Sequence, residues 1–263
     1  MTDIGKGGVE PGDRYGDRFF VSEVPGWFLR QGLRGRGLAP KGACPRRRGG
    51  DMPRSARRVA DGGVYHILNR GNGQQRVFQK DGDFLVFIDL LGEMRERYSI
   101  DLLAYCLIPN HFHLLVKVDR GEDLSRGMQW FMTTHVRRYH RHYRSSGHLW
   151  QGRYKSFGIE DDDHLLTVAR YVEGNPVRAG LVDTAKDWQW SSHRERCEQI
   201  EGEGGSLSGF LKGLSPSHLL SPLPIALPQD WTTFVDTPLT GRELAKVRKK
   251  IVRQAGVSGG LAL

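Results

Sequence analysis

Along residues 64–175, segments with the hydrophobic pattern of a strand alternate with segments that have the pattern of a helix. This alternation restricts the possible folds more than any other feature of the sequence. Short apolar or alternating segments predict strands at 64–71, 100–108, 111–118 and 148–160. Apolar residues three and four positions apart predict helices at 81–98, 123–143 and 161–175. The order β-α-β-β-α-β-α predicts an α+β fold, a ferredoxin-like four-stranded antiparallel sheet with helices on one face.

The regions that flank this core are less regular. Residues 1–51 contain 12 of the 34 glycines, ten Lys/Arg and six Asp/Glu without a sustained period, which predicts a disordered basic segment. We favour Met52 as the natural start, and the alternative is a basic arm with non-specific affinity for DNA. We expect the main domain at 52–196. For residues 197–263 we expect a linker and a short basic helix at 242–254.

Composition and charge exclude several classes of protein. No apolar run reaches the roughly 18 to 20 residues of a membrane span, and the N-terminus lacks the pattern of a secretory signal. Three widely spaced cysteines form neither a disulfide framework nor a CxxC metal site, which fits a reducing compartment and a cytoplasmic protein. The net charge of +9 favours an anionic partner such as nucleic acid.

Positive charge and aromatic side chains are concentrated in residues 124–159. This stretch contains seven Lys/Arg, four His and no Asp or Glu, together with seven Trp, Tyr and Phe residues. Basic groups can hold a nucleic-acid backbone while aromatic rings stack on unpaired bases, so single-stranded nucleic acid is a candidate ligand. The alternative interpretation is a solvated helix face beside ordinary core aromatics.

A pair of histidines lies in the predicted strand 111–118. His111 and His113 are two residues apart, so on a strand both imidazoles project from the same face while Phe112 projects from the other. Two adjacent imidazoles can begin a divalent-metal site that takes a third ligand from elsewhere. A pair of structural histidines would have the same spacing.

The last predicted core helix offers a nucleophile and a third ligand. Tyr171 and Asn175 are four residues apart and therefore neighbours on one helical face, together with His164. We expect this helix to lie across the site, where a phenolate could attack a phosphodiester while the two histidines and Asn175 hold a metal ion. The alternative is that Tyr171 is a boundary aromatic and Asn175 ends the helix.

Several motifs together resemble a known family. The sequences NRGN, IPNHFHLLVKV, HLWQGRYKS and ARYVEGNPVRAGLV, followed by WSS, resemble the REP-associated tyrosine transposases across residues 52–196. These proteins are insertion-sequence-200-like, single-tyrosine members of the HUH nuclease superfamily. The resemblance implies a metal-dependent transposase and endonuclease that cleaves single-stranded DNA near a hairpin, such as a REP-like or terminal palindrome. It further implies a 5′-phosphotyrosine intermediate, Mg²⁺ or Mn²⁺ as cofactor, and a monomer or homodimer.

The resemblance carries over to individual positions. His111 and His113 match the HUH pair, Tyr171 matches the nucleophile, and Asn175 matches the polar residue on the metal side. The rival nucleophiles Tyr139, Tyr143 and Tyr154 lack a partnered amide at the matching place. The residues expected to contact DNA are Asn69, Arg70, Asn72, Arg137, Arg138, Arg141, Arg153, Lys155 and Arg178. The family's larger members continue beyond a basic helix such as 242–254, so we expect a shortened C-terminus here.

Two other functions fit parts of the sequence. A domesticated or decayed DNA-binding protein without turnover would fit the shortened tail, but not the four intact residues of the expected active site. An RNA-binding module of related topology would need stacking aromatic residues on its central strands, where this chain has histidines. We therefore expect a transposase.

Overall fold

The computed structural model describes residues 59–201 and 219–247, and the predicted segment 1–51 and its boundary at Met52 lie outside them. The core elements follow the predicted order β-α-β-β-α-β-α. They are β1 (Val64–Arg70), α1 (Asp81–Tyr98), β2 (Ile100–Ile108), β3 (His111–Val118), α2 (Gly121–Tyr143), β4 (Lys155–Gly158) and α3 (Asp162–Glu173). The shorter elements are η3 (Asn72–Gln74), α4 (Asn175–Arg178), η4 (Ala185–Asp187), α5 (His193–Glu201) and α6 (Trp231–Asp236).

The four strands form one antiparallel sheet in the order β2-β3-β1-β4, which is the ferredoxin-like arrangement. The α+β fold predicted from the sequence is therefore confirmed. In the register of the central pair, Leu68 lies opposite His113 and Arg70 opposite His111. Because directly opposite residues share a face of the sheet, these four side chains project to the same side.

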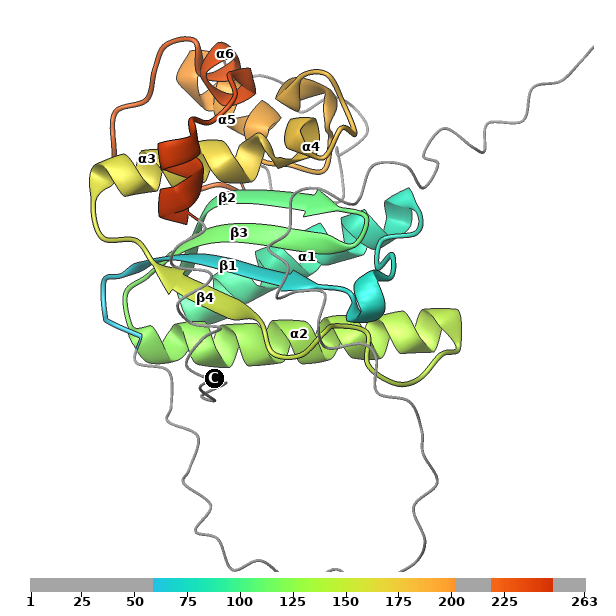
Figure 1. The fold of residues 1–263 in the computed structure, drawn as a ribbon. Helices are drawn as coiled ribbons and strands as arrows, with labels where there is room; N and C mark the ends of the chain where they lie inside the picture. The colour runs from blue at the N-terminus through green and yellow to red at the C-terminus, as the bar shows by residue number, and fades with distance from the viewer. Residues whose placement is uncertain (1–58, 202–218, 248–263) are drawn as a thin grey trace, which may run out of the picture.

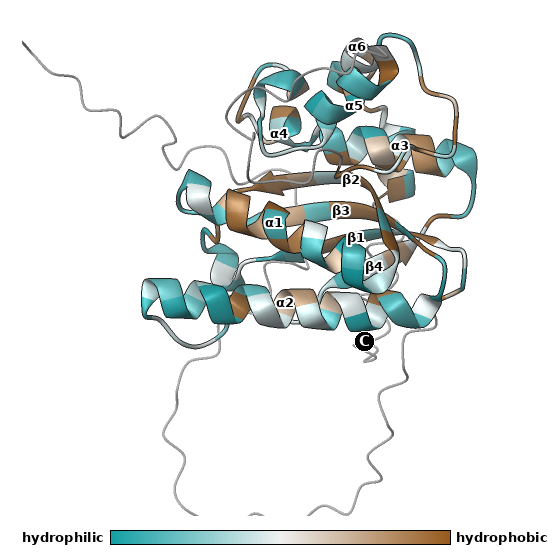
Figure 2. Ribbon diagram, turned by 180° about the vertical axis from the view of Figure 1, so that it is seen from behind, coloured by the Kyte–Doolittle hydropathy of each residue, from teal (hydrophilic) through white to brown (hydrophobic). Residues whose placement is uncertain are grey.

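Helices cover both faces of the sheet (Figure 1). The amphipathic helices α1 and α2 pack against one face, where Phe87 of α1 contacts Phe112 of β3 and Phe131 of α2, with ring centroids 5.1 and 4.7 Å apart. Helix α3 lies across the other face, with α4 to α6 beside it. Figure 2 shows β2 and β3 as mainly hydrophobic strands between these two layers.

Two predicted elements are shorter in the structure than in the sequence analysis. The predicted strand 148–160 is reduced to β4, and it is preceded by Gly152, whose φ of 154° is rarely adopted by residues with a side chain. The predicted helix 161–175 begins after Asp161, whose carboxylate accepts a hydrogen bond from the His164 backbone N–H, and ends at Gly174. Asn175 therefore begins the next helix, α4.

The region after residue 187 packs on the α3 side of the sheet. Residues 188–192 run along the outer edge of β2, where the Leu107 N–H donates to the Trp190 carbonyl oxygen and the Ser192 N–H to that of Tyr105.

Residues 219–247, within the segment expected to contain a linker, place Leu220 and Trp231 in the hydrophobic core. The expected helix 242–254 is helical up to residue 247, and its remainder lies outside the described residues. In the described part of the chain, no helix is long and apolar enough to span a membrane.

Candidate active site

The histidine pair lies on the face of the sheet that α3 covers. His111 and His113 project toward α3, whereas Phe112 and Leu114 between and beside them are buried on the α1 and α2 side. The centroids of the two imidazole rings are 5.1 Å apart. The strand therefore presents two imidazole rings side by side, as its period of two predicts.

Each imidazole is oriented by a hydrogen bond at its Nδ1 atom. His111 Nδ1 donates to Asn110 Oδ1 at 2.7 Å, and His113 Nδ1 lies 2.9 Å from Nε2 of His66 on β1. With the proton on Nδ1, the Nε2 atom of each ring keeps its lone pair. Metal-binding histidines are usually held in this way, with one nitrogen bonded to the protein and the other facing the metal.

Burial keeps these histidines neutral. It lowers the pKa of His66 and of His111 to about 3, helped by His164 and Arg178 in the first case and by Arg70 and Arg178 in the second. The pKa of His113 is also well below its ordinary value, because of burial and because protonation would be opposed by His111, His66 and Arg178. The neutral imidazole is the form that binds metal ions, so the donor set fits a divalent cation at neutral pH.

Asn175 is the residue that the sequence analysis expected beside the histidine pair. Across residues 59–201 and 219–247, no cluster of three His, Cys, Asp or Glu side chains could hold a metal ion. Asn175 is 7% exposed and makes no side-chain hydrogen bond within the described residues. An amide oxygen is a suitable ligand for Mg²⁺ or Mn²⁺, so Asn175 stays a candidate for this role.

Tyr171 lies against the histidines. Its ring centroid is 5.6 Å from that of His113 and 6.0 Å from that of His66, in edge-to-face geometry. The guanidinium carbon of Arg178 lies 4.2 Å from the Tyr171 ring centroid, and Arg178 also donates a hydrogen bond to the Tyr171 carbonyl oxygen. The site thus combines a half-buried phenol, a cation and two neutral imidazoles.

The rival tyrosines have other environments. Tyr139 and Tyr143 lie on α2, on the opposite side of the sheet. The Tyr143 hydroxyl donates to Asp83, and burial together with this carboxylate raises the pKa of Tyr143. Tyr154 lines a groove of about 950 Å³ beside α2. Tyr171, by contrast, packs against His113 and His66.

The residues expected to contact DNA fall into several groups. Arg70 and Arg178 flank the histidines, and half-buried Lys155 lies on the same face of the sheet, opposite Leu68. Arg137 and Arg153 line the groove of about 950 Å³ together with Trp150 and Tyr154.

The other expected DNA contacts lie away from the histidines. Asn69 projects to the opposite face, where its Nδ2 donates to the Gly152 carbonyl oxygen. Asn72 and Arg141 are exposed, and Arg138 forms an ion pair with Glu93 at 3.0 Å. Side-chain exposure therefore leaves Asn72 and Arg141 accessible to a ligand, whereas Asn69 supports the loop around Gly152.

The sequence analysis missed two groups of residues. His66 holds His113, and the signal available was its position in strand 64–71, on the same alternating face as Leu68 and Arg70. The second group surrounds Glu173, a buried acid two residues after Tyr171. Its partners lie in the WSSH segment and near residue 231, so no local spacing pointed to them.

Comparison with known proteins shows which family the sequence is similar to. The family model described as "Transposase IS200 like" matches residues 61–175. A Haemophilus influenzae protein described as a REP-associated tyrosine transposase is 32% identical over 132 residues, which is 45% of this chain and 74% of that protein.

Two solved structures are also similar. One, of a REP-associated tyrosine transposase bound to a REP hairpin, is 18% identical with a TM-score of 0.45 and covers 63% of this chain and 98% of its own. The other, of a transposase-like protein from Deinococcus radiodurans, is 19% identical with a TM-score of 0.31 and covers 45% of this chain and 95% of its own. The sequence match spans most of the Haemophilus protein.

Proposed function

The chain belongs to the family of REP-associated, IS200-like tyrosine transposases, and we propose that it cleaves and rejoins single-stranded DNA beside a hairpin through a covalent tyrosine intermediate. The observation that carries this proposal is the contact of Tyr171 with His113 and Arg178. This contact brings a phenol, a guanidinium group and an imidazole together at one point of the sheet, and these groups are chemically suited to act as nucleophile, phosphate-binding cation and metal ligand.

The proposed cleavage begins at the Tyr171 hydroxyl group. The hydroxyl releases its proton to solvent as its oxygen attacks the scissile phosphorus, and the new Oη–P bond forms as the P–O3′ bond breaks. The departing oxygen takes up one proton from solvent and becomes a free 3′-OH, so that no net proton is gained or lost. The Arg178 guanidinium carbon lies 4.2 Å from the centroid of the Tyr171 ring, and Arg70 lies beside His111 at the same edge of the site. Rejoining is the reverse step, in which a 3′-OH attacks the 5′-phosphotyrosine.

We propose Mg²⁺ or Mn²⁺ as the cofactor, held by His111 Nε2, His113 Nε2 and Asn175. The support is the donor set, since both imidazoles are neutral and use Nδ1 for other contacts. When bound, the cation would polarise the scissile phosphate and compensate the charge that develops during transfer.

For the partner, we propose a DNA hairpin of the REP-like or terminal-palindrome type. The groove lined by Arg137, Arg153, Trp150 and Tyr154 offers positive charge and aromatic rings for unpaired nucleotides next to such a hairpin. Because Tyr171 contacts His113 of its own chain, a monomer contains all the residues of the proposed active site, and a homodimer would contain two such sites. A DNA transposase acts where the chromosome is, so we propose a cytoplasmic location.

The test is the formation of a covalent protein–DNA complex. Full-length protein is incubated with labelled hairpin oligonucleotides from the flanks of its own gene, with Mg²⁺, with Mn²⁺ or without metal, and run on a denaturing gel. We expect a metal-dependent band that Tyr171→Phe abolishes and the matched control Tyr139→Phe retains. Hairpin binding with no adduct or cleavage in either metal would instead indicate a DNA-binding protein without turnover, and an adduct that persists in Tyr171→Phe would refute the assignment of the nucleophile.

A further inference from the structure

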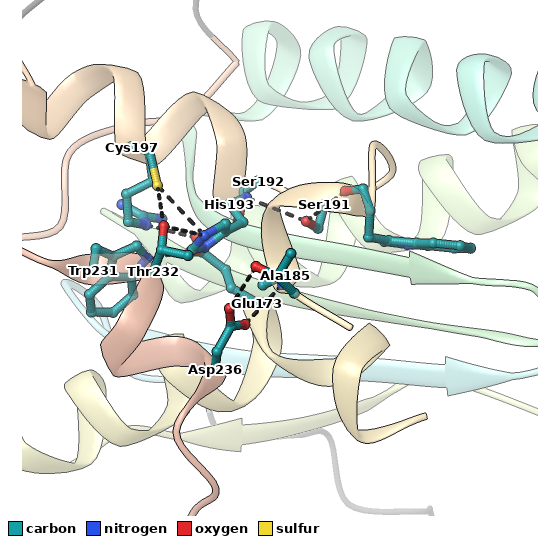
Figure 3. Close-up of polar contacts among 12 residues, drawn as sticks. Glu173, Ala185, Ser191, Ser192, His193, Cys197, Trp231, Thr232 and Asp236 are labelled. Atoms are coloured by element: carbon teal, nitrogen blue, oxygen red, sulfur yellow. Dashed lines mark hydrogen bonds and ion pairs between the residues drawn. The ribbon is translucent and has the colours of Figure 1, made fainter. Parts of the chain in front are cut away.

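Helix α3 carries a completely buried carboxylate two residues after Tyr171. The Glu173 side chain is 0% exposed and accepts four side-chain hydrogen bonds, two on each oxygen. Figure 3 shows the polar contacts around Glu173, with Ser192, His193 and Trp231. Oε1 accepts from Ser192 Oγ and from Arg196 Nε, both at 2.7 Å. Oε2 accepts from Trp231 Nε1 at 2.6 Å and from His193 Nδ1 at 3.2 Å. A buried charge is tolerated only with such complete pairing.

Two of these donors connect Glu173 to the strand beside the histidines. Ser192 Oγ accepts a hydrogen bond from the Tyr105 N–H at 3.0 Å, and Arg196 donates to the Leu103 carbonyl oxygen. Both backbone partners, the Tyr105 N–H and the Leu103 carbonyl oxygen, are on β2, in which Cys106 lies directly opposite His113. Helix α3 is thus connected by side chains to the same part of the sheet that holds the histidine pair.

The C-terminal segment holds α3 as well. Trp231 begins α6 and contributes one of the four bonds to Glu173. One turn earlier on α3, Arg170 donates to the Thr237 carbonyl oxygen at 2.7 Å and pairs with Glu243 at 3.1 Å. Side chains of α3 are therefore fixed at two points by residues more than 55 positions later in the chain.

We propose that Glu173 is a positioning residue, which sets the distance between Tyr171 and the histidine pair by fixing α3 to β2 and α6. At 100° per residue, Tyr171 and Glu173 point to nearly opposite sides of the helix, so Glu173 can hold the helix without touching the substrate. The inference rests on the proposed role of Tyr171 as nucleophile. Reacting groups tolerate little displacement, and about 1 Å can change a rate by about 100-fold.

The network could instead contribute to stability alone, and the experiment must separate these roles. Glu173→Gln keeps the size of the side chain but turns one acceptor oxygen into an amide N–H₂ group, which then faces two of the four donors. Glu173→Asp keeps the charge but withdraws the carboxylate by one methylene. Asp163→Asn, an exposed change on the same helix, is the matched control.

The first readout is activity in the hairpin assay, at a temperature where thermal melts show that every variant is folded. We expect Glu173→Gln and Glu173→Asp to slow single-turnover adduct formation by about 10- to 100-fold. Hairpin affinity should change by less than about threefold, because Glu173 is buried away from the ligand. Asp163→Asn should behave as the wild type. If the adduct forms at wild-type rate in both Glu173 variants, the proposal is wrong.

The second readout does not depend on activity. The protein is labelled with 3-fluorotyrosine, and the ¹⁹F NMR signal of Tyr171 is assigned as the one missing in Tyr171→Phe. We expect this signal to shift or broaden in the Glu173 variants and to stay unchanged in Asp163→Asn, whereas a role in stability alone leaves the folded-state signal unchanged. Should the wild type form no adduct at all, the proposed function fails, but the NMR comparison still decides whether Glu173 positions Tyr171.

If the Glu173 variants do not fold, two milder changes test the same network. Ser192→Ala and Trp231→Phe each remove one donor to Glu173, and the second retains most of the aromatic ring that packs in the core. We expect a smaller effect in the same direction on both readouts. A wild-type Tyr171 signal and a wild-type rate of adduct formation in both variants would overturn the proposal.

Discussion

Replacing His66 by Phe should weaken metal binding although His66 is not itself an expected ligand. His66 Nε2 is the hydrogen-bond partner of His113 Nδ1, and both side chains are less than 5% exposed. Phe would preserve the aromatic contacts of this ring with Phe157 and Tyr171, but would leave His113 Nδ1 without an acceptor. The proton of His113 could then move to Nε2, which would remove the lone pair that the metal needs.

The expected magnitudes follow from this geometry. Loss of a residue that orients a metal-binding histidine typically lowers metal affinity by about 10- to 100-fold, equivalent to about 1.4 to 2.8 kcal/mol. A buried N–H without an acceptor also destabilises the fold by roughly 1 to 3 kcal/mol. Titration of free Mn²⁺ by electron paramagnetic resonance measures the first effect, and urea unfolding near neutral pH measures the second.

His66→Gln is the matched control for this prediction. The amide of Gln reaches about as far as the imidazole Nε2 and can accept the same hydrogen bond, so this variant should retain most of the affinity. The reasoning is refuted if His66→Phe binds Mn²⁺ as tightly as the wild type does, or if Gln and Phe weaken binding equally.

Two further predictions concern Arg178 and His193. Arg178→Lys keeps the charge but loses the planar group over the Tyr171 ring. It should slow adduct formation roughly tenfold, the equivalent of about 1.4 kcal/mol. Equal rates for this variant and the wild type on denaturing gels would contradict this prediction. Burial opposes a charge on His193, but hydrogen bonds with Cys197 and Glu173 outweigh it and raise its pKa to about 9. A raised pKa stabilises the fold below the unfolded value of 6.5, and this contribution disappears as the pH rises through 9, so the free energy of unfolding should fall by roughly 3 kcal/mol between these pH values. Urea unfolding of His193→Asn should show a clearly smaller fall, and an equal fall in both proteins would count against the assignment.

The sequence predicted the fold most accurately where one local pattern decided the structure. Helix 81–98 and strands 100–108 and 111–118 have their predicted bounds, because a sustained period and a Pro-Asn turn define them locally. The strand predicted at 148–160 is shorter in the structure. Its first part pairs through an isolated bridge between Gly71 and Trp150, and Gly152 separates this part from β4. Such a bridge joins residues nearly 80 positions apart, so no local pattern predicts it.

The residues of the candidate site were likewise predictable only where a local pattern was sufficient. The spacing of His111 and His113 was sufficient to predict a shared face, and the structure brings Tyr171 to that face. His66 escaped notice because its contact with His113 depends on the register between two strands that are 47 residues apart. The role of Glu173 could not be predicted, because its four hydrogen-bond donors come from two later segments of the chain.

The segment along the outer edge of β2 also limits how this protein can associate. An uncovered edge strand offers free backbone groups to which another chain can add a strand, in aggregates or in extended sheets. Here the Trp190 carbonyl oxygen and the Ser192 and Ser221 N–H groups already bond to β2. A second copy could join its sheet to β2 only by displacing these residues, and with them Ser192, which also bonds to Glu173. Protection against strand addition and the fixed position of α3 therefore depend on the same short stretch of chain.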